Sequence, residues 1–342
     1  MHHQYPVPEF FDPAHAAQFL RTDYETRARQ AAEWASKNGM APASQDEKKV
    51  WLLLVDMQNT FCLPEFELFV GGRSGRGAVE DTIRLCRFIY SNLGSLTHIT
   101  ATLDTHTAMQ IFHSIFLVDK DGAHPPPYSL ISAAQVRAGQ WRFNPGLADQ
   151  FGISPDYGQE LLLHYVTELE QHGKYELTVW PYHAMLGGVG HALVACVEEA
   201  LFFHTIARST QTEFEIKGRY PFTENYSAIG PEVLAGPMNE ILGERSPHFV
   251  EKLKEMDALI VAGQAKSHCV AWTVQDLLDN IRETDASLAA RVYLLEDCTS
   301  PVVVPGADYS DAADQAYARF AEAGMHRVRS SDPLDAWPDF PT

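Results

Sequence analysis

The sequence predicts an α/β fold of three layers, in which helices cover both faces of a six-stranded, mostly parallel sheet. Apolar material is ample, since hydrophobic residues make up 45% of the 342 residues. Short β-branched apolar runs also alternate with longer stretches that carry apolar residues at helical spacing. Such alternation is typical of parallel sheets joined by crossover helices, whose functional groups gather at the carboxyl ends of the strands.

The strands and helices follow one another from residue 50 to the C-terminal region. The apolar runs predict strands at 50–55, 97–103, 214–216, 258–262, 292–295 and 326–328. The stretches between them predict helices at 79–93, 191–206, 249–256, 270–281 and 312–323.

Two regions lie outside this alternation. Residues 1–47 are polar and Ala-rich, and we expect an N-terminal extension that is helical around 14–37. The segment at about 114–178 has no clean strand-helix unit, and connections of this length are usually lids, binding loops or oligomer arms. We therefore expect one domain over 48–342 with an insertion at about 114–178.

The composition excludes several classes of partner. The formal net charge is −19 without a dense basic cluster, which argues against nucleic acid and anionic membranes. No run approaches the length of a membrane span, and the first residues lack the pattern of a signal peptide. Five scattered cysteines predict neither a disulfide framework nor a thiolate zinc site. We expect a cytoplasmic protein, and the sequence leaves open whether it forms a homo-oligomer.

Cys269 stands between a predicted strand and a predicted helix. The apolar run 258–263 precedes it, and apolar residues at helical spacing follow it. The positive end of a helix dipole favours the thiolate at such a turn, which is a common place for a nucleophile. A buried, inert thiol is the usual alternative for a single cysteine. Position alone leaves the two interpretations balanced.

Other strand ends carry further candidate residues. Asp56 ends the first strand and is a candidate general base. Asp104 and His106 end the second, where a carboxylate and an imidazole can both face a metal. Lys217 ends the third and would stabilise a nearby thiolate. Each has a structural alternative, namely a turn cap, a hydrogen-bonded pair and a solvated strand end. Their joint placement at one sheet edge favours an active site.

The segments around these residues resemble the nicotinamidase and isochorismatase-like cysteine hydrolases. The similar segments are LLVDMQNTF at 53–61, KG at 217–218 with NYSA at 225–228, and VAGQAKSHCV at 261–270. The resemblance implies an isochorismatase-like, Rossmann-like fold with Asp56 as acid/base, Lys217 as catalytic lysine and Cys269 as nucleophile. It also implies a cis peptide bond between Gln264 and Ala265, and an oxyanion hole formed by the backbone N–H groups of Ala265 and Cys269.

The metal-binding, nicotinamidase-related branch of this family is similar in two further places. These are the Asp-x-His after the second strand and the WPYH segment at 180–183. The resemblance therefore implies a divalent metal held by Asp104, His106 and His183, and this ligand set favours zinc.

The implied reaction is hydrolysis of a small, nicotinamide-like carboxamide to the acid and ammonia through a cysteine thioester. Phe61 and Trp180 are placed to enclose a flat ring, or are plain core aromatic residues. The alternatives are another cysteine hydrolase of the family, of isochorismatase type or acting on N-carbamoyl or other small amides, and a non-catalytic binding or assembly member.

Several departures from the family pattern bear on the substrate. Ala184 follows the WPYH segment where a cysteine is usual, and position 110 is Gln where a histidine is usual. His113 comes three residues later, and we expect a surface or structural role for it. The extension at 1–47 and the insertion add length that compact members lack.

Overall fold

The computed structural model describes residues 4–172, 174–246, 248–304 and 306–341. Its contacts divide the chain into two units. The first comprises Met1–Leu103, Ala192–Glu215 and Pro247–Thr342, and the second comprises Asp104–His191 and Ile216–Ser246. The predicted extension falls within the first unit and the predicted insertion within the second, and both boundaries stay predictions. Among the described residues, no helix combines the length and apolarity needed to cross a membrane.

The central sheet has six strands in the order β12-β9-β8-β1-β2-β7. The pairings from β12 to β2 are all parallel. The strands are β1 (Val50–Val55), β2 (His98–Asp104), β7 (Glu213–Lys217), β8 (Ala258–Gly263), β9 (Val292–Leu295) and β12 (His326–Val328). Every residue of β1 and β8 is buried, as expected for central strands covered on both faces. All six predicted strands are present, each within one residue of its predicted ends.

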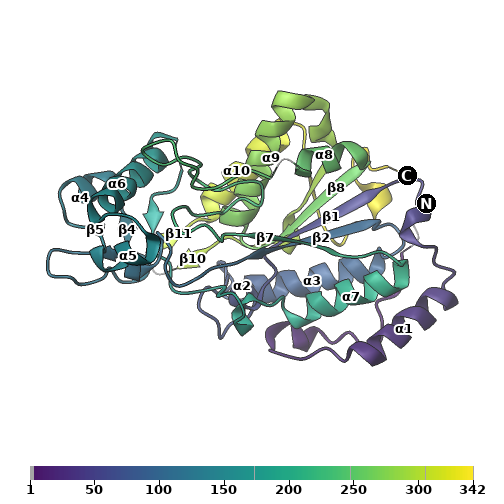
Figure 1. Cartoon of the computed structure of the whole chain (residues 1–342). Coiled ribbons are helices and arrows are strands. Elements are labelled where there is room, and N and C mark those ends of the chain that lie inside the picture. The colour runs from purple at the N-terminus through teal and green to yellow at the C-terminus, as the bar shows by residue number, and fades with distance from the viewer. Residues whose placement is uncertain (1–3, 173, 247, 305, 342) are drawn as a thin grey trace. The chain divides into compact units, whose positions relative to one another are not determined.

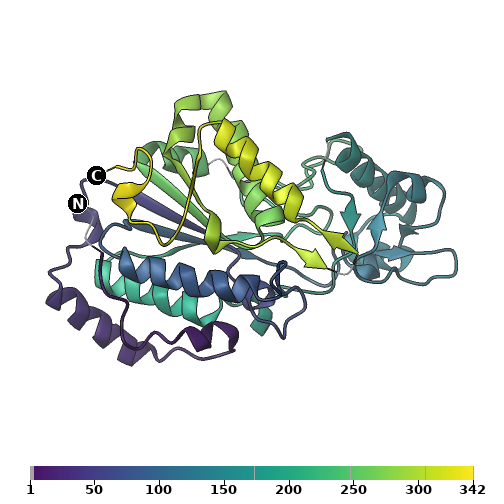
Figure 2. The same ribbon diagram turned by 180° about the vertical axis from the view of Figure 1, so that it is seen from behind.

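Helices cover both faces of this sheet. Figures 1 and 2 show α3 (Gly77–Ser91) and α7 (Ala195–Arg208) on one face, with α8 (His248–Glu255), α9 (Ala271–Thr284) and α10 (Ser310–Glu322) on the other. Helix α3 packs against α7, and α9 packs against α8 and α10. The three layers confirm the predicted fold class. The unit also contains the one-turn helix α2 (Asn59–Cys62) and the antiparallel pair of β10 (Val303–Val304) and β11 (Ala307–Asp308).

Short stretches of tighter helix connect many of these elements. In the first unit they include η2 (Ala43–Gln45), η7 (Ala286–Arg291), η8 (Glu296–Cys298) and η9 (Leu334–Ala336).

The N-terminal region contains two helices where the sequence predicts one. The turn η1 (Pro13–Ala17) and helix α1 (Tyr24–Lys37) are separated by a non-helical stretch. The cause is local capping, because the Asp23 side chain accepts the Thr26 N–H and so begins a new helix. The Thr22 hydroxyl donates to Glu198 of α7, and α1 packs along α7 (Figure 1).

The second unit consists of one long helix, α6, and several short elements. Its helices are α4 (Ala133–Arg137), α5 (Ala148–Phe151) and α6 (Pro155–Gln171), and its tighter turns are η3 (Ser114–Phe116), η4 (Pro145–Leu147) and η5 (Val189–His191). Two antiparallel pairs join β3 (Leu117–Val118) to β5 (Arg142–Phe143) and β4 (Leu130–Ile131) to β6 (Leu177–Thr178). Helix α6 packs on α4 and β5, and its Ser154 and Pro155 form a regular helix start.

A buried histidine makes the stability of the first unit depend on pH. His204 of α7 is fully buried, and its Nε2–H donates to the Leu96 carbonyl at 2.8 Å. Burial lowers the pKa of His204 to about 4, although the hydrogen bond to Leu96 opposes the shift. Between the ordinary pKa of about 6.5 and this value, the unfolded chain binds a proton that the folded chain does not. Stability contributed by neutral His204 is therefore lost as the pH falls through this window.

We expect His204→Gln to reduce the pH dependence of stability. Glutamine retains an N–H donor for Leu96 and does not titrate. Between pH 7 and pH 5 the wild-type free energy of unfolding should fall by about 2 kcal/mol more than that of the variant. Urea denaturation of both proteins at the two pH values measures the difference. The other histidines contribute equally to both proteins, so their contribution cancels in the comparison. Equal losses in the two proteins would contradict the assignment.

Candidate functional site

The turn that carries Cys269 follows β8 directly. Gly263 ends β8. Its φ is +122°, and an added Cβ would lie only 2.1 Å from the Val55 carbonyl oxygen, so only glycine fits at this position. The peptide bond between Gln264 and Ala265 is cis, at the position that the family resemblance implies. The buried turn η6 (Lys266–Val270) then leads into α9, so Cys269 lies in a strand-to-helix turn as predicted.

Asp56 lies at the end of the strand beside β8. The register pairs Val55 with Gly263, so Asp56 and the Cys269 turn follow the carboxyl ends of neighbouring strands. Asp56 is buried and has a φ of 49°, a conformation that non-glycine residues rarely adopt. The Thr102 hydroxyl accepts the Asp56 N–H and donates to its Oδ1, which fixes the carboxylate.

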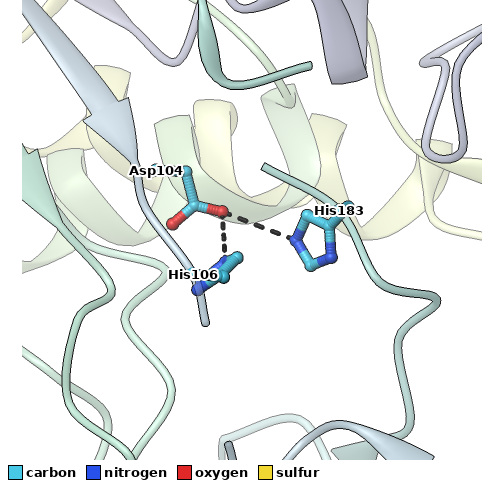
Figure 3. Close-up of side chains that lie close together, drawn as sticks. All are labelled: Asp104, His106 and His183. Carbon is cyan, nitrogen blue, oxygen red and sulfur yellow. Dashed lines mark hydrogen bonds and ion pairs between the residues drawn. The ribbon is translucent and has the colours of Figure 1, made fainter. Parts of the chain in front are cut away.

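In the second unit, Asp104, His106 and His183 form a buried group of three potential metal ligands. One ligand atom from each lies within 4.8 Å of the others. Asp104 Oδ2 is 2.7 Å from His106 Nε2 and 3.5 Å from His183 Nε2 (Figure 3). Ligands of a tetrahedral zinc ion with bonds of about 2.0–2.1 Å stand about 3.3 Å apart. A shared face of one carboxylate and two imidazoles therefore fits a divalent metal.

The backbone sets the orientation of both imidazole rings. His106 Nδ1 is 3.1 Å from the Gly218 carbonyl, and His183 Nδ1 is 2.8 Å from the Pro181 carbonyl. Since a carbonyl only accepts, both Nδ1 atoms carry hydrogen and both Nε2 atoms are directed at the carboxylate. This second contact is typical of metal-binding histidines.

The His183 segment is held against His106 by main-chain hydrogen bonds. The His106 N–H donates to the Ala184 carbonyl, and the Leu186 N–H donates to the His106 carbonyl. These bonds explain why two segments distant in sequence deliver their imidazoles to one point.

Charge holds Asp104 ionised despite its burial. Burial raises the pKa of Asp104, but the neighbouring charges of His106 and Lys217 outweigh it and hold the pKa well below its usual range. Burial lowers the pKa of His183, which keeps its ring neutral and able to bind a metal. For His106, burial is outweighed by Asp104, which raises the pKa.

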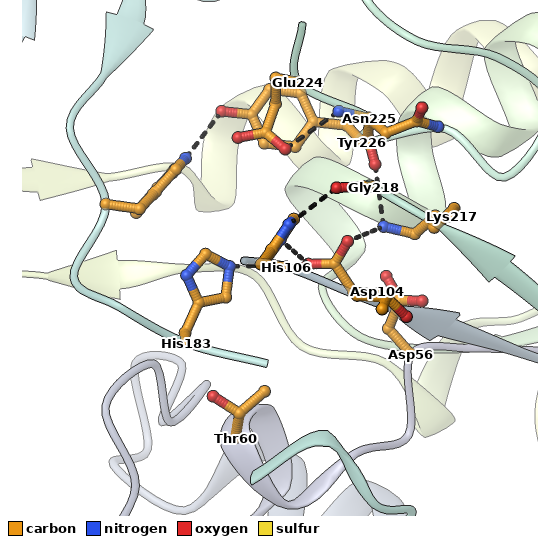
Figure 4. Close-up of polar contacts among 12 residues, drawn as sticks. Asp56, Thr60, Asp104, His106, His183, Lys217, Gly218, Glu224, Asn225 and Tyr226 are labelled. Atoms are coloured by element: carbon orange, nitrogen blue, oxygen red, sulfur yellow. Dashed lines mark hydrogen bonds and ion pairs between the residues drawn. The ribbon is translucent and has the colours of Figure 1, made fainter. Parts of the chain in front are cut away.

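Lys217 joins this group through the other oxygen of the same carboxylate. Its Nζ donates to Asp104 Oδ1 at 2.8 Å and to the Asn225 carbonyl at 2.9 Å (Figure 4). The Thr105 N–H also donates to the Lys217 carbonyl, which ties the ends of β2 and β7 together. The sequence predicts that Lys217 stabilises a thiolate, and the structure adds this ion pair with a predicted metal ligand.

Gly218 permits the close approach of these groups. Its φ is +82°, and an added Cβ would lie 2.7 Å from Asp104 Oδ1 and 2.8 Å from the His106 ring. The Gln110 side-chain amide donates to the carbonyls of Gly218 and Tyr220, which holds the turn from the other side.

His113 also lies beside the candidate metal centre, where the sequence predicts only a surface or structural role. Its ring centroid is 6.0 Å from that of His106, 6.1 Å from that of His183 and 4.7 Å from that of Tyr182. Burial, with the charges of His183 and His106, lowers the pKa of His113 to about 3. Within the described residues, its buried Nε2 has no hydrogen-bond partner. The sequence separation between His113 and the Asp104–His106 pair fits no motif, so the sequence could not predict that His113 lies beside these residues.

The two predicted aromatic residues lie in packed surroundings. Phe61 belongs to the hydrophobic core of the first unit. Trp180 is buried in the second unit, and its indole N–H donates to the Tyr226 hydroxyl at 3.0 Å. These are the surroundings of core aromatic residues, and contact with a substrate ring stays a prediction.

We expect Gly218→Ala to damage the candidate metal centre specifically. The added methyl group would displace Asp104 or His106, and zinc affinity should fall at least about tenfold, as when a supporting contact of a metal ligand is lost. Gly122→Ala is the matched control, because Gly122 has the same φ of +82° with open space around it. Zinc titration of both purified variants gives the comparison. Equal affinities would show that the methyl group is tolerated at position 218.

The sequence matches no family model. It also matches none of the curated proteins. Solved structures do match the fold. The yeast nicotinamidase bound to the inhibitor nicotinaldehyde is 18% identical, with a TM-score of 0.50, and the match covers 82% of this chain and 99% of that chain.

Two further matches have lower TM-scores. The Acinetobacter baumanii nicotinamidase/pyrazinamidase is 17% identical with a TM-score of 0.49, covering 84% of this chain and 99% of that chain. The Thermoplasma acidophilum N-carbamoylsarcosine amidase is 14% identical with a TM-score of 0.41, covering 83% and 98%. On the sheet order and the likeness to the yeast structure, this chain has the fold of the nicotinamidase and isochorismatase-like hydrolase family.

Proposed function

We propose that the chain is a cysteine-dependent amidohydrolase of this family, which converts a small, nicotinamide-like carboxamide into the acid and ammonia. The observation that carries the proposal is the buried group of Asp104, His106 and His183, whose carboxylate also binds Lys217. A structural ion pair needs only one cation for a carboxylate. Two imidazoles turned toward the same oxygen by backbone carbonyls are an arrangement typical of metal sites.

In the proposed mechanism Asp56 takes the proton of the Cys269 thiol, and the sulfur attacks the carboxamide carbon. The N–H groups of Ala265 and Cys269 stabilise the oxyanion, and Lys217 stabilises the negative charge of thiolate and carboxylate. Asp56 gives its proton to the amide nitrogen as the C–N bond breaks, so that ammonia leaves and a thioester remains. Asp56 then takes a proton from water, whose oxygen attacks the thioester. The acid leaves, and the proton returns to the Cys269 sulfur.

Asp104, His106 and His183 would hold a divalent metal, and their one-carboxylate, two-imidazole set favours zinc. When bound, the metal supplies Lewis-acid attraction for a ring nitrogen or a water molecule and so orients the substrate. Phe61 and Trp180 are proposed to contact the flat ring. A substrate with a ring nitrogen and a carboxamide, as in nicotinamide, suits both the metal and the thiol.

We expect Cys269→Ala to abolish ammonia release while the protein stays folded. The matched control is Cys196→Ala, because Cys196 is a buried thiol of α7 with no role in the proposed chemistry. Ammonia is assayed with nicotinamide, pyrazinamide and other small amides, and folding is followed by circular dichroism. Normal turnover by Cys269→Ala would show that Cys269 is not the nucleophile. Turnover of a different class of amide alone would show that the substrate is not nicotinamide-like.

We expect His183→Ala to lose both the metal and most of the activity. The change removes one imidazole and leaves the Lys217–Asp104 ion pair in place. Zinc content by mass spectrometry and ammonia release are measured before and after dialysis against a chelator, with zinc added back. Full activity in metal-free wild-type protein would exclude the proposed role of the metal.

A further inference from the structure

The position of the Lys217 ammonium depends on an irregular loop. Lys217 is buried, and its Nζ donates to the Asn225 main-chain carbonyl as well as to Asp104. Asn225 lies outside any helix or strand. Some other contact must therefore hold its carbonyl in place.

Glu224 supplies much of that support. Its Oε1 accepts the Asn225 N–H at 3.0 Å (Figure 4), and its main-chain carbonyl accepts the Glu232 N–H at 2.8 Å. The neighbouring Thr223 hydroxyl accepts the Val233 N–H at 3.1 Å. Asn225, whose carbonyl faces Lys217, is thus held at its N–H by the carboxylate of the residue before it.

A buried hydroxyl of helix α6 reaches this loop. Tyr165 is fully buried, and its hydroxyl accepts the Glu224 N–H at 3.1 Å. Burial raises the pKa of Tyr165 well above its usual value, so this group stays a neutral phenol. A cavity of about 10 Å³ adjoins Tyr165, Glu224 and Tyr226, which is space for one water molecule at most. The loop has little room to settle elsewhere.

We infer that helix α6, which belongs to the segment at about 114–178, is a positioning element for the catalytic lysine and acts through Tyr165 and Glu224. The chain of contacts runs from the Tyr165 hydroxyl to the Glu224 peptide and carboxylate, then to the Asn225 carbonyl and the Lys217 ammonium. The inference rests on the proposed function for its effect on turnover. It assigns the long segment a part in catalysis that needs no contact with the substrate.

Tyr165→Phe tests the first contact. Loss of the acceptor leaves a buried N–H unsatisfied, and kcat should fall by about ten- to a hundredfold with KM changed less than about twofold. Tyr157→Phe is the matched control, because Tyr157 lies on the same helix and its hydroxyl bonds Glu240 instead. Wild-type kcat in Tyr165→Phe, or an equal loss in Tyr157→Phe, would overturn the inference.

Two substitutions of Glu224 test the second contact. Glu224→Gln keeps an acceptor oxygen for the Asn225 N–H and should retain most of kcat, whereas Glu224→Ala removes it and should match Tyr165→Phe. Burial raises the pKa of Glu224 to about 7, so a neutral side chain is compatible with this site. Equal kcat values for the Gln and Ala variants would contradict the role of this oxygen.

The visible spectrum of the cobalt-substituted protein gives a readout that does not depend on turnover. Asp104 is shared by Lys217 and the candidate metal ligands, so a displaced Lys217 should change the absorption of Co²⁺ in Tyr165→Phe and Glu224→Ala. Tyr157→Phe should keep the wild-type spectrum. If wild-type protein releases ammonia from no amide, the proposed function fails, and the spectra still decide the inference. Unchanged spectra in all variants would overturn it.

Discussion

The carboxylate of Asp104 is the group on which the rest of the candidate metal centre depends. One carboxylate oxygen accepts a hydrogen bond from the Lys217 ammonium, and the other faces His106 and His183. This carboxylate brings the ends of β2 and β7 and the segment before Ala184 to a common point, and hydrogen bonds of His106 to the carbonyls of Gly218 and Ala184 join the same segments. Loss of this charge would leave a buried ammonium without its counter-ion, which costs several kcal/mol. Both the proposed lysine chemistry and the proposed metal binding therefore depend on one ionised side chain.

Burying so many charged groups is a poor way to stabilise a fold, because desolvation offsets much of the attraction. The arrangement is better explained by function, and its details support that view. Main-chain carbonyls of Pro181, Gly218 and Asn225 each accept from a side chain of the candidate centre. The precision of the centre then depends on the shape of the loops that carry these carbonyls. For that reason residues outside the centre, such as Tyr165, can control it.

The sheet could be predicted from the sequence because its signal is local. Each predicted strand is a short apolar run. The residues that follow three of these runs, Asp56, Asp104 and Lys217, indicate the candidate functional edge of the sheet. His183 entered only through the family resemblance, since no local pattern relates it to His106. Tyr165 could not have been predicted, because its role depends on contacts between segments that no period or motif connects. The break before α1 was missed because one capping aspartate outweighed helical composition.

The departure at position 110 shows how such loops adapt. A histidine is usual in the family at this place, and Gln110 makes three hydrogen bonds here: it donates to the carbonyls of Gly218 and Tyr220 and accepts the Thr107 N–H. A histidine has two ring nitrogens and could not make all three. Gly218 accepts from both Gln110 and His106, which fixes the His106 ring. Glutamine at position 110 therefore changes how the His106 ring is held in place. The set of potential metal ligands, Asp104, His106 and His183, stays complete.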